Sequence, residues 1–201
     1  MTSSEGRHHH RPMLPGDRAI EASSGSVDPA ELAEAADRAA TLLVRGAHDS
    51  TDVGVADRLL HLADTEGIET IAEVWASSPG DSLAGCLWRL YLLRSWVYAD
   101  PEGVARQYDA GRARAQVARV VAGVADPPGP EDLKAMIDQV LRGIAESDFA
   151  DVLFRAAAFA RVVAAGRADQ PGVSDEQVSR MLALAEQLEA AGHAELSHGL
   201  A

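Results

Sequence analysis

The chain has 201 residues, 24% of them charged, and a formal net charge of −13 at neutral pH. Such a charge repels phosphate backbones and disfavours general nucleic-acid binding, while a chain of this length buries enough surface to fold without disulfide or metal cross-links. The single cysteine, Cys86, excludes a disulfide within the chain and is typical of proteins in a reducing cytoplasm.

Residues 1–27 are rich in serine, glycine, proline and charged residues and have no apolar periodicity, which predicts a disordered tail. This tail contains a histidine triplet, His8 to His10, which we interpret as part of the solvated segment rather than as a metal site. No apolar run follows the basic residues, so the sequence predicts no signal peptide.

Three helices are predicted before the first long apolar stretch. Asp28 and Pro29 are residue types that favour a helix N-cap and first position, and apolar residues then recur at helical spacing up to Gly46. Two further helices follow, at 51–66 and 68–76.

One face of the second helix has the composition of a metal site. Asp57, His61 and Asp64 lie together there at a spacing that suits a divalent metal. The apolar residues occupy the opposite arc of the helical wheel, which indicates that the three polar side chains face solvent. We therefore predict no metal site and no cofactor.

The stretch from Leu83 to Val97 is the predicted centre of the fold, because a helix here is apolar on every side. Trp88, Leu92 and Trp96 form one of its stripes. The stretch is too short to span a membrane and contains two arginines, which are costly in mid-span. We therefore expect the central helix of a soluble bundle and no membrane role.

Those two arginines, Arg89 and Arg94, leave two interpretations open. In the first, both form structural ion pairs, because a buried arginine needs a carboxylate partner. The candidate partners are Asp64, Glu73 and Asp109. In the second, Arg89 or Arg94 binds an anionic ligand in a pocket beside aromatic residues. These aromatic residues are Trp88, Tyr91 and Tyr98.

Asp100 and Pro101 begin the next predicted helix, which extends to Val124 and has a stripe of small residues that we expect to pack against the central helix. Four arginines lie on this helix: Arg106, Arg112, Arg114 and Arg119. We expect them to pair with acidic residues elsewhere in the fold. Two alternatives remain: Arg112 and Arg119 bind an anion or an acidic partner, or the four contact nucleic acid.

The sharpest break in the chain lies at 126–130, which contains three prolines. Two amphipathic helices follow, at 130–145 and 147–165. Each has one apolar face, which predicts surface helices that cover the core.

The last predicted helix follows a linker at 167–173. It begins at Ser174, whose spacing from Gln177 predicts a capping box. Its apolar stripe is expected to dock on the bundle or on a second copy of the chain. Residues 193–201 are expected to fray.

Together these elements predict an all-α protein with a single bundle of seven to eight helices from residue 28 to residue 192. The sequence contains none of the common hydrolase, nucleotide-binding or metalloprotease motifs, so we assign no catalytic residue. The leading hypothesis is a non-catalytic interaction or regulatory module of the bacterial cytoplasm that binds a protein partner or self-associates. The alternatives are a small-molecule or anion-binding protein, enzymes included, with a pocket at Arg89 and Arg94, and a DNA-associated regulator that uses the arginines of the 101–124 helix.

Overall fold

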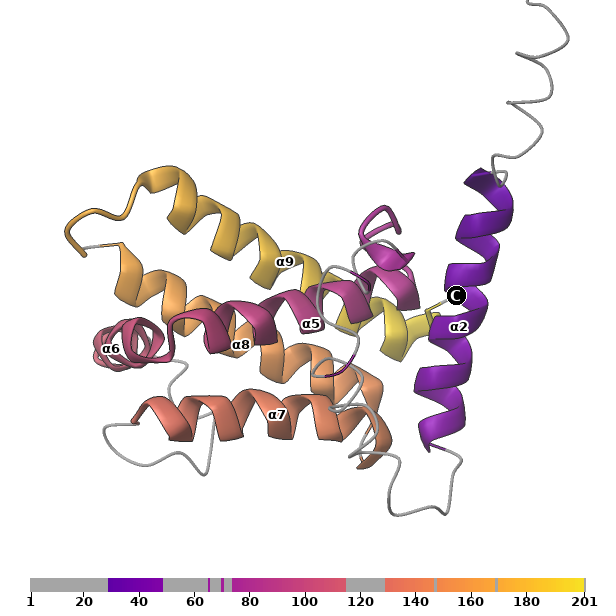
Figure 1. Cartoon of the computed structure of the whole chain (residues 1–201), viewed down its shortest axis with the longest axis horizontal. Coiled ribbons are helices and arrows are strands. Elements are labelled where there is room, and N and C mark those ends of the chain that lie inside the picture. The colour runs from indigo at the N-terminus through magenta and orange to yellow at the C-terminus, as the bar shows by residue number, and fades with distance from the viewer. Residues whose placement is uncertain are drawn as a thin grey trace, which may run out of the picture.

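The computed structural model describes residues 29–48, 65, 70, 74–114, 129–146, 148–168 and 170–200, and these parts of the chain contain helices and no strand. The six helices within them are α2 (Pro29–His48), α5 (Leu83–Ala99), α6 (Pro101–Arg112), α7 (Pro130–Glu146), α8 (Phe149–Arg167) and α9 (Asp175–His198) (Figure 1). The all-α class is therefore confirmed. The predicted tail at 1–27, the helix at 51–66 and most of the helix at 68–76 lie outside the described residues.

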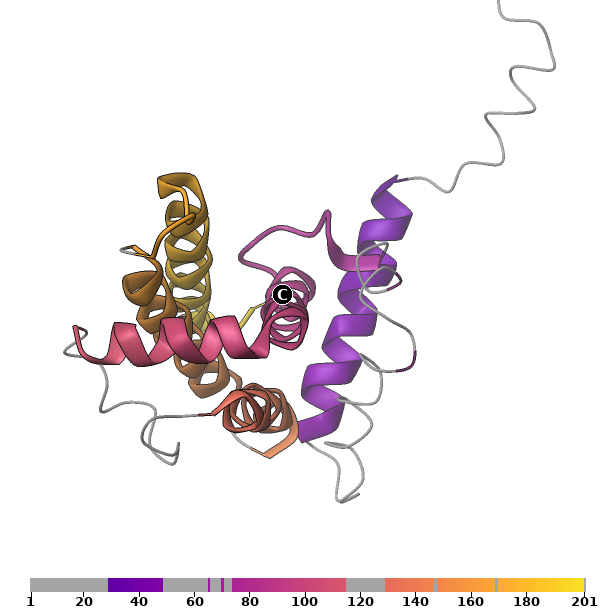
Figure 2. The ribbon, with the colours of Figure 1, turned by 60° about the vertical axis from the view of Figure 1, so that its left-hand side comes forward.

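Helices α5, α7, α8 and α9 lie roughly along one direction, whereas α6 crosses one end of this group and α2 stands at a steep angle beside α5 (Figures 1 and 2). Within the described ranges, no helix has both the length and the apolar character needed to cross a membrane. Helices α5 and α9 run in opposite directions (Figure 1).

The predicted helix starts follow local capping chemistry. Ser82 accepts a hydrogen bond from the Gly85 N–H at 3.1 Å and begins α5. Asp100 accepts one from the Gly103 N–H at 2.9 Å and begins α6. The capping box of α9 is present, with Ser174 as its N-cap. Each cap satisfies a backbone donor that has no partner within the helix.

The C-terminal ends of two helices, α6 and α9, differ from the sequence-based expectation. Helix α6 ends at Arg112 rather than Val124, because residues 113 and 114 form a turn. Fraying was expected after Gly192, whereas α9 continues to His198. Its last turn is held by Glu195, which accepts hydrogen bonds from Arg45 of α2 and from the Leu200 N–H.

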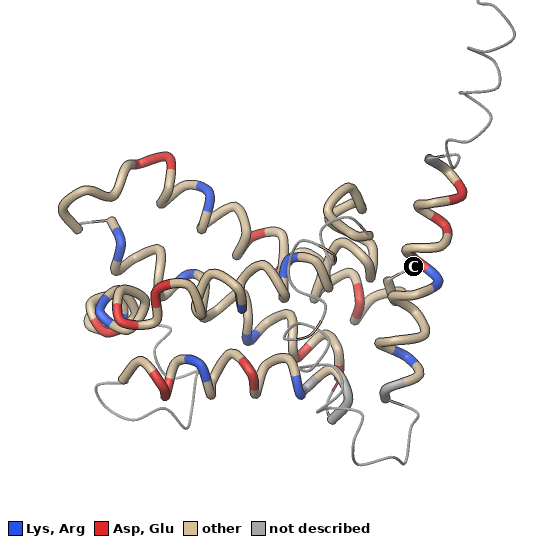
Figure 3. The backbone as a smooth tube through the Cα atoms, in the orientation of Figure 1, with Lys and Arg blue, Asp and Glu red and all other residues tan. Residues whose placement is uncertain are grey.

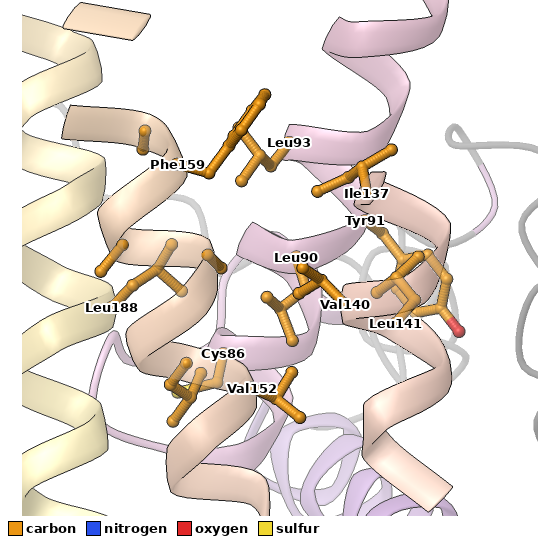
Figure 4. Packing of buried hydrophobic residues seen from close by; sticks show 14 of the residues in the cluster. Cys86, Leu90, Tyr91, Leu93, Ile137, Val140, Leu141, Val152, Phe159 and Leu188 are labelled. Atoms are coloured by element: carbon orange, nitrogen blue, oxygen red, sulfur yellow. The ribbon is translucent and has the colours of Figure 1, made fainter. Parts of the chain in front are cut away.

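The core lies between α5 and the helices around it. Figure 4 shows side chains of α5 packed against α7 on one side and against α8 and α9 on the other. The labelled residues are Cys86, Leu90, Tyr91, Leu93, Ile137, Val140, Leu141, Val152, Phe159 and Leu188, and all of them are buried. The predicted helix over Leu83 to Val97 is present and ten residues of α5 are buried, whereas its stripe of Trp88, Leu92 and Trp96 is partly buried or exposed.

Helix α8 is a second central helix, which corrects the expectation of a surface helix with one apolar face. Thirteen of its residues are buried, including the uninterrupted run from Ala156 to Ala160. The helical periodicity indicated one apolar face, whereas the small alanine side chains let neighbouring helices approach α8 from several directions. Helix α6 uses this: Gly111 lies against the Val162 carbonyl and Gly166 of α8. Within the described part of the predicted small-residue stripe, Gly111 therefore packs against α8 rather than α5.

Candidate functional site

Arg89 and Arg94 lie five residues apart on α5 and therefore point in different directions around the helix. Arg94 faces α7, where it contacts Asp138, and Arg89 faces α9, where it contacts Gln187. Arg94 therefore matches the ion-pair interpretation, whereas Arg89 contacts a neutral amide.

Arg94 forms an ion pair inside the fold. Its Nε donates to Asp138 Oδ1 at 2.9 Å, and the hydroxyl of Tyr98 donates to Asp138 Oδ2 at 2.6 Å. The guanidinium carbon of Arg94 lies 4.0 Å from the centroid of the Tyr98 ring. Since only 6% of Arg94 is exposed, this carboxylate compensates a buried charge, and the cluster holds α5 against α7.

Asp138 was not among the carboxylates that the sequence suggested as partners. Glu73 and Asp64 lie outside the described residues, and Asp109 is an exposed residue of α6. A usable signal was present in α7 itself, because Asp138 directly follows buried Ile137 and so lies at the edge of the apolar face of that helix. An acidic residue at such an edge can reach a charge on the helix that the face covers.

Tyr91, a candidate binding residue from the sequence, packs in the core and does not line the groove between α5 and α9. Its ring stacks on Trp75, with centroids 6.2 Å apart, and only 1% of Tyr91 is exposed. Burial raises the pKa of its hydroxyl above the usual value. Trp75 in turn donates from its indole N–H to the Ala36 carbonyl at 3.1 Å, so this pair joins α2 to α5.

The aromatic stripe of α5 lines a groove of about 600 Å³ between α5 and α9, which Arg167 of α8 also lines. Trp88, Leu92 and Trp96 form the α5 side, as the stripe seen in the sequence suggests. Three basic residues line it, namely Arg89 of α5, Arg167 of α8 and Arg180 of α9. Figure 3 shows that basic and acidic positions are both spread along α8 and α9. The complete lining is Ala76, Trp88, Arg89, Leu92, Leu93, Trp96, Arg167, Gln177, Arg180, Met181, Ala183, Leu184 and Gln187.

Arg89 stands at one end of this groove and is held by two hydrogen bonds. Its Nε donates to Gln187 Oε1 at 2.7 Å, and Nη1 donates to the Gly85 carbonyl at 2.7 Å. The loop before α5 covers the guanidinium closely, since a Cβ on Gly80 would lie 3.0 Å from Nη2 of Arg89. The Arg89 side chain is therefore fixed in place without an acidic partner in these contacts.

Arg167 stands at the other end, where it lies over Trp96. The guanidinium carbon is 5.3 Å from the centroid of the Trp96 ring, a distance that permits a cation–π interaction. The Nε atom of Arg167 is buried and has no hydrogen-bond partner. Burial also lowers the pKa of Arg167 from its usual value, although a guanidinium stays protonated at neutral pH.

The third arginine, Arg180, differs from the other two because it is exposed and forms an ion pair with Glu176 one turn earlier in α9. No aspartate or glutamate is among the described residues that line the groove, although the chain as a whole has 31 acidic against 18 basic residues. The groove is therefore a local reversal of the overall charge.

The remaining sequence candidates are not brought to this groove. Arg112 is the last residue of α6 and Arg106 is exposed on the same helix, whereas Arg119 lies outside the described residues. The metal candidates Asp57, His61 and Asp64 also lie outside them. In the part of the chain that is described, no group of three or more potential metal ligands occurs.

Cys86 lacks the features of a reactive cysteine. Its thiol is buried in the core, 3.6 Å from the Gly80 carbonyl, and burial raises its pKa to about 12. At neutral pH it is a thiol and therefore a poor nucleophile.

Sequence reasoning found Arg89 and Trp88 but missed Arg167, Met181 and Gln187. Arg167 had been assigned to a linker because Gly166 suggested the end of a helix, whereas α8 includes both residues. Comparison with known protein families, with curated proteins and with solved structures finds no match for this chain.

Proposed function

We propose that this protein is a non-catalytic binding module that takes a small organic anion with an apolar body into the groove between α5 and α9. The observation that carries this proposal is the lining itself, which combines two tryptophans with three arginines and has no described acidic residue. An apolar pocket with a few placed polar groups is the usual form of a small-molecule site.

The side chains of the groove support binding rather than catalysis. Its described lining offers arginine, glutamine, tryptophan and aliphatic groups, and none of these is a general base or nucleophile near neutral pH. The proposal therefore keeps the non-catalytic, regulatory role expected from the sequence and joins it to the anion-binding alternative. It takes the chain from residue 28 to the end of α9 at His198 as one bundle of seven or eight helices in a cytoplasmic protein.

A protein partner or self-association remains part of this proposal as the response to ligand. The apolar stripe of α9 that suggested a second copy is in contact with the same chain, since Met181, Ala185 and Leu188 are buried. Light scattering with and without ligand would detect a ligand-dependent change in association. We do not retain the nucleic-acid alternative, because no observation favours it.

The test uses anilinonaphthalene sulfonate, a fluorescent anion with an aromatic body. We expect saturable binding to the wild-type chain. Leu92→Glu places a negative charge in the groove beside the anionic dye, and like charges within one small site repel by roughly 2 kcal/mol at an effective dielectric constant of about 20. Solvent screening reduces this, so we expect affinity to fall about tenfold, equivalent to about 1.4 kcal/mol.

The matched control is Leu182→Glu on α9. Leu92 and Leu182 are both 40% exposed, but only Leu92 lines the groove. Leu182→Glu should bind the dye as the wild type does. The proposal is wrong if the wild-type chain shows no saturable binding, or if both variants lose affinity equally.

A further inference from the structure

We infer that the groove is polarised and selects a monocarboxylate, with the carboxylate held by Arg167 and a flat apolar body extending along α5 toward Arg89 and Gln187. This inference rests on the proposed function and adds the class of ligand and its orientation.

The two ends of the groove differ in whether the protein satisfies the hydrogen-bond donors of the arginine there. At the Arg89 end, Nε and Nη1 already donate to Gln187 and to the Gly85 carbonyl, both at 2.7 Å. At the Arg167 end, Nε is buried and has no acceptor. A buried donor without an acceptor is costly. An anionic oxygen from a ligand gains more at Arg167 than at Arg89, because only there does it satisfy a donor that the protein leaves unsatisfied.

The orientation of the Arg167 guanidinium favours a planar carboxylate. Its guanidinium lies over Trp96, which limits the directions in which its N–H groups can point. The Nε edge of a guanidinium presents two parallel N–H donors and matches one planar carboxylate. Arg180 is paired with Glu176, and Arg89 already donates to Gln187 and to the Gly85 carbonyl. Among the three arginines of the groove, Arg167 is thus the one with a buried donor that lacks an acceptor, and this suits a ligand with one carboxylate.

The length of the groove between its two ends sets the size of the ligand. Arg89 and Trp96 are separated by seven residues of α5, which is about 10 Å along the helix axis. The surfaces between these ends are apolar, with Leu92 and Leu93 on α5 and Met181 and Leu184 on α9. A body of about that length with flat faces fits, such as two fused aromatic rings. The distal end of the ligand meets the Arg89–Gln187 hydrogen bond, where a neutral hydroxyl finds polar partners.

The experiment is isothermal titration calorimetry on the full chain with naphthoate and its neutral isostere naphthylmethanol. We expect the wild type to prefer the acid by at least about tenfold, because a hydrogen bond to a charged group typically changes affinity by tenfold to a hundredfold. Arg167→Gln should weaken naphthoate binding by this factor and leave naphthylmethanol unchanged, which removes the preference. Arg180→Gln is the control and should change the acid-to-alcohol ratio less than about threefold.

Two further measurements keep the inference falsifiable if Arg167→Gln folds poorly. Arg167→Lys keeps the charge but loses the two parallel donors, and should give an intermediate preference. A hydroxynaphthoate with its hydroxyl at the far end should bind more tightly than naphthoate, and Gln187→Ala should abolish that gain.

The results separate this inference from the proposed function. If the sulfonate dye binds in the groove but the wild type binds naphthylmethanol as well as naphthoate, or Arg167→Gln keeps the preference, the inference is overturned and the binding module stands. If the dye does not bind, the proposed function itself fails.

Discussion

The crossing of α6 over α8 can be tested by adding one methyl group. Gly166 lies where the two helices meet, beside Gln107 and Gly111 of α6. The change Gly166→Ala introduces a Cβ at this point and nothing else. Because Gly166 directly precedes Arg167, the same crossing also fixes the backbone from which the proposed carboxylate anchor extends.

The expected loss of stability follows from the distances. A Cβ on Gly166 would lie 1.7 Å from the Gln107 carbonyl oxygen and 2.7 Å from the Gly111 nitrogen. Both are backbone atoms, so no rotamer change relieves the contact and the helices must separate. Overpacking costs about 3 kcal/mol at the upper end of its usual range, and alanine regains about 1 kcal/mol through its helix propensity. We expect a net loss of about 2 kcal/mol, or a decrease in Tm of about 4–8 °C.

The assay is urea and thermal unfolding followed by far-UV circular dichroism, with Gly46→Ala as the control. Gly46 is also a helical glycine, in α2, but a Cβ there would have no atom within 4 Å. Gly46→Ala should therefore stabilise the chain slightly, by about 0.5 kcal/mol. If Gly166→Ala is as stable as the wild type, or if both variants shift in the same direction, the close crossing of α6 and α8 is refuted.

Two other contacts give predictions of opposite kinds. Asp138→Ala should lower the free energy of unfolding by about 3 kcal/mol, because it removes the carboxylate beside buried Arg94. Glu131→Ala, at an exposed ion pair of the same helix, should lower it by less than about 0.5 kcal/mol. Equal losses for the two variants in urea unfolding would contradict this. The hydrogen bond from Arg45 lowers the pKa of Glu195 below its usual 4.5, so stability contributed by this carboxylate is present above that pH and is lost as the pH falls through the folded-state pKa. Tm measured between about pH 3 and pH 7 should therefore fall less steeply at the acid end in Glu195→Gln than in the wild type, and identical profiles would disprove the role of this pair.

The sequence was most informative where structure depends on neighbouring residues. The starts of α5, α6 and α9 were predictable because a capping side chain and the backbone N–H that it accepts are two or three residues apart. The buried character of α5 was predictable for a similar reason, since every side of one short helix could be inspected at once.

Contacts between helices were predicted less well, because periodicity says which face of a helix is apolar but not what covers it. The small-residue stripe of the predicted 101–124 helix was assigned to α5, its neighbour in sequence, whereas its described residue Gly111 packs on α8. The choice depends on a complementary glycine, Gly166, which lies 55 positions after Gly111. For the same reason Asp138 was not foreseen as the partner of Arg94.

The candidate site combines both cases. Its α5 side was visible in the sequence as the stripe of Trp88, Leu92 and Trp96, while its other side required the positions of α8 and α9. Arg89 could be named in advance because a charge inside an apolar helix stands out. Arg167 could not, because an arginine at the end of a helix is ordinary in sequence and becomes unusual only when its surroundings are known.

What makes Arg167 unusual is the contrast with the other arginines of an acidic chain. Carboxylates outnumber cations in this chain, and described arginines on several helices form ion pairs with them. Arg45 pairs with Glu195, Arg94 with Asp138 and Arg161 with Glu189. In such a chain a carboxylate partner is easily supplied, and a buried guanidinium nitrogen without an acceptor is correspondingly hard to explain as architecture alone. An external carboxylate at the groove would give Arg167 the kind of partner that the fold gives Arg45, Arg94 and Arg161, and the stability that it adds would be available only when ligand is bound.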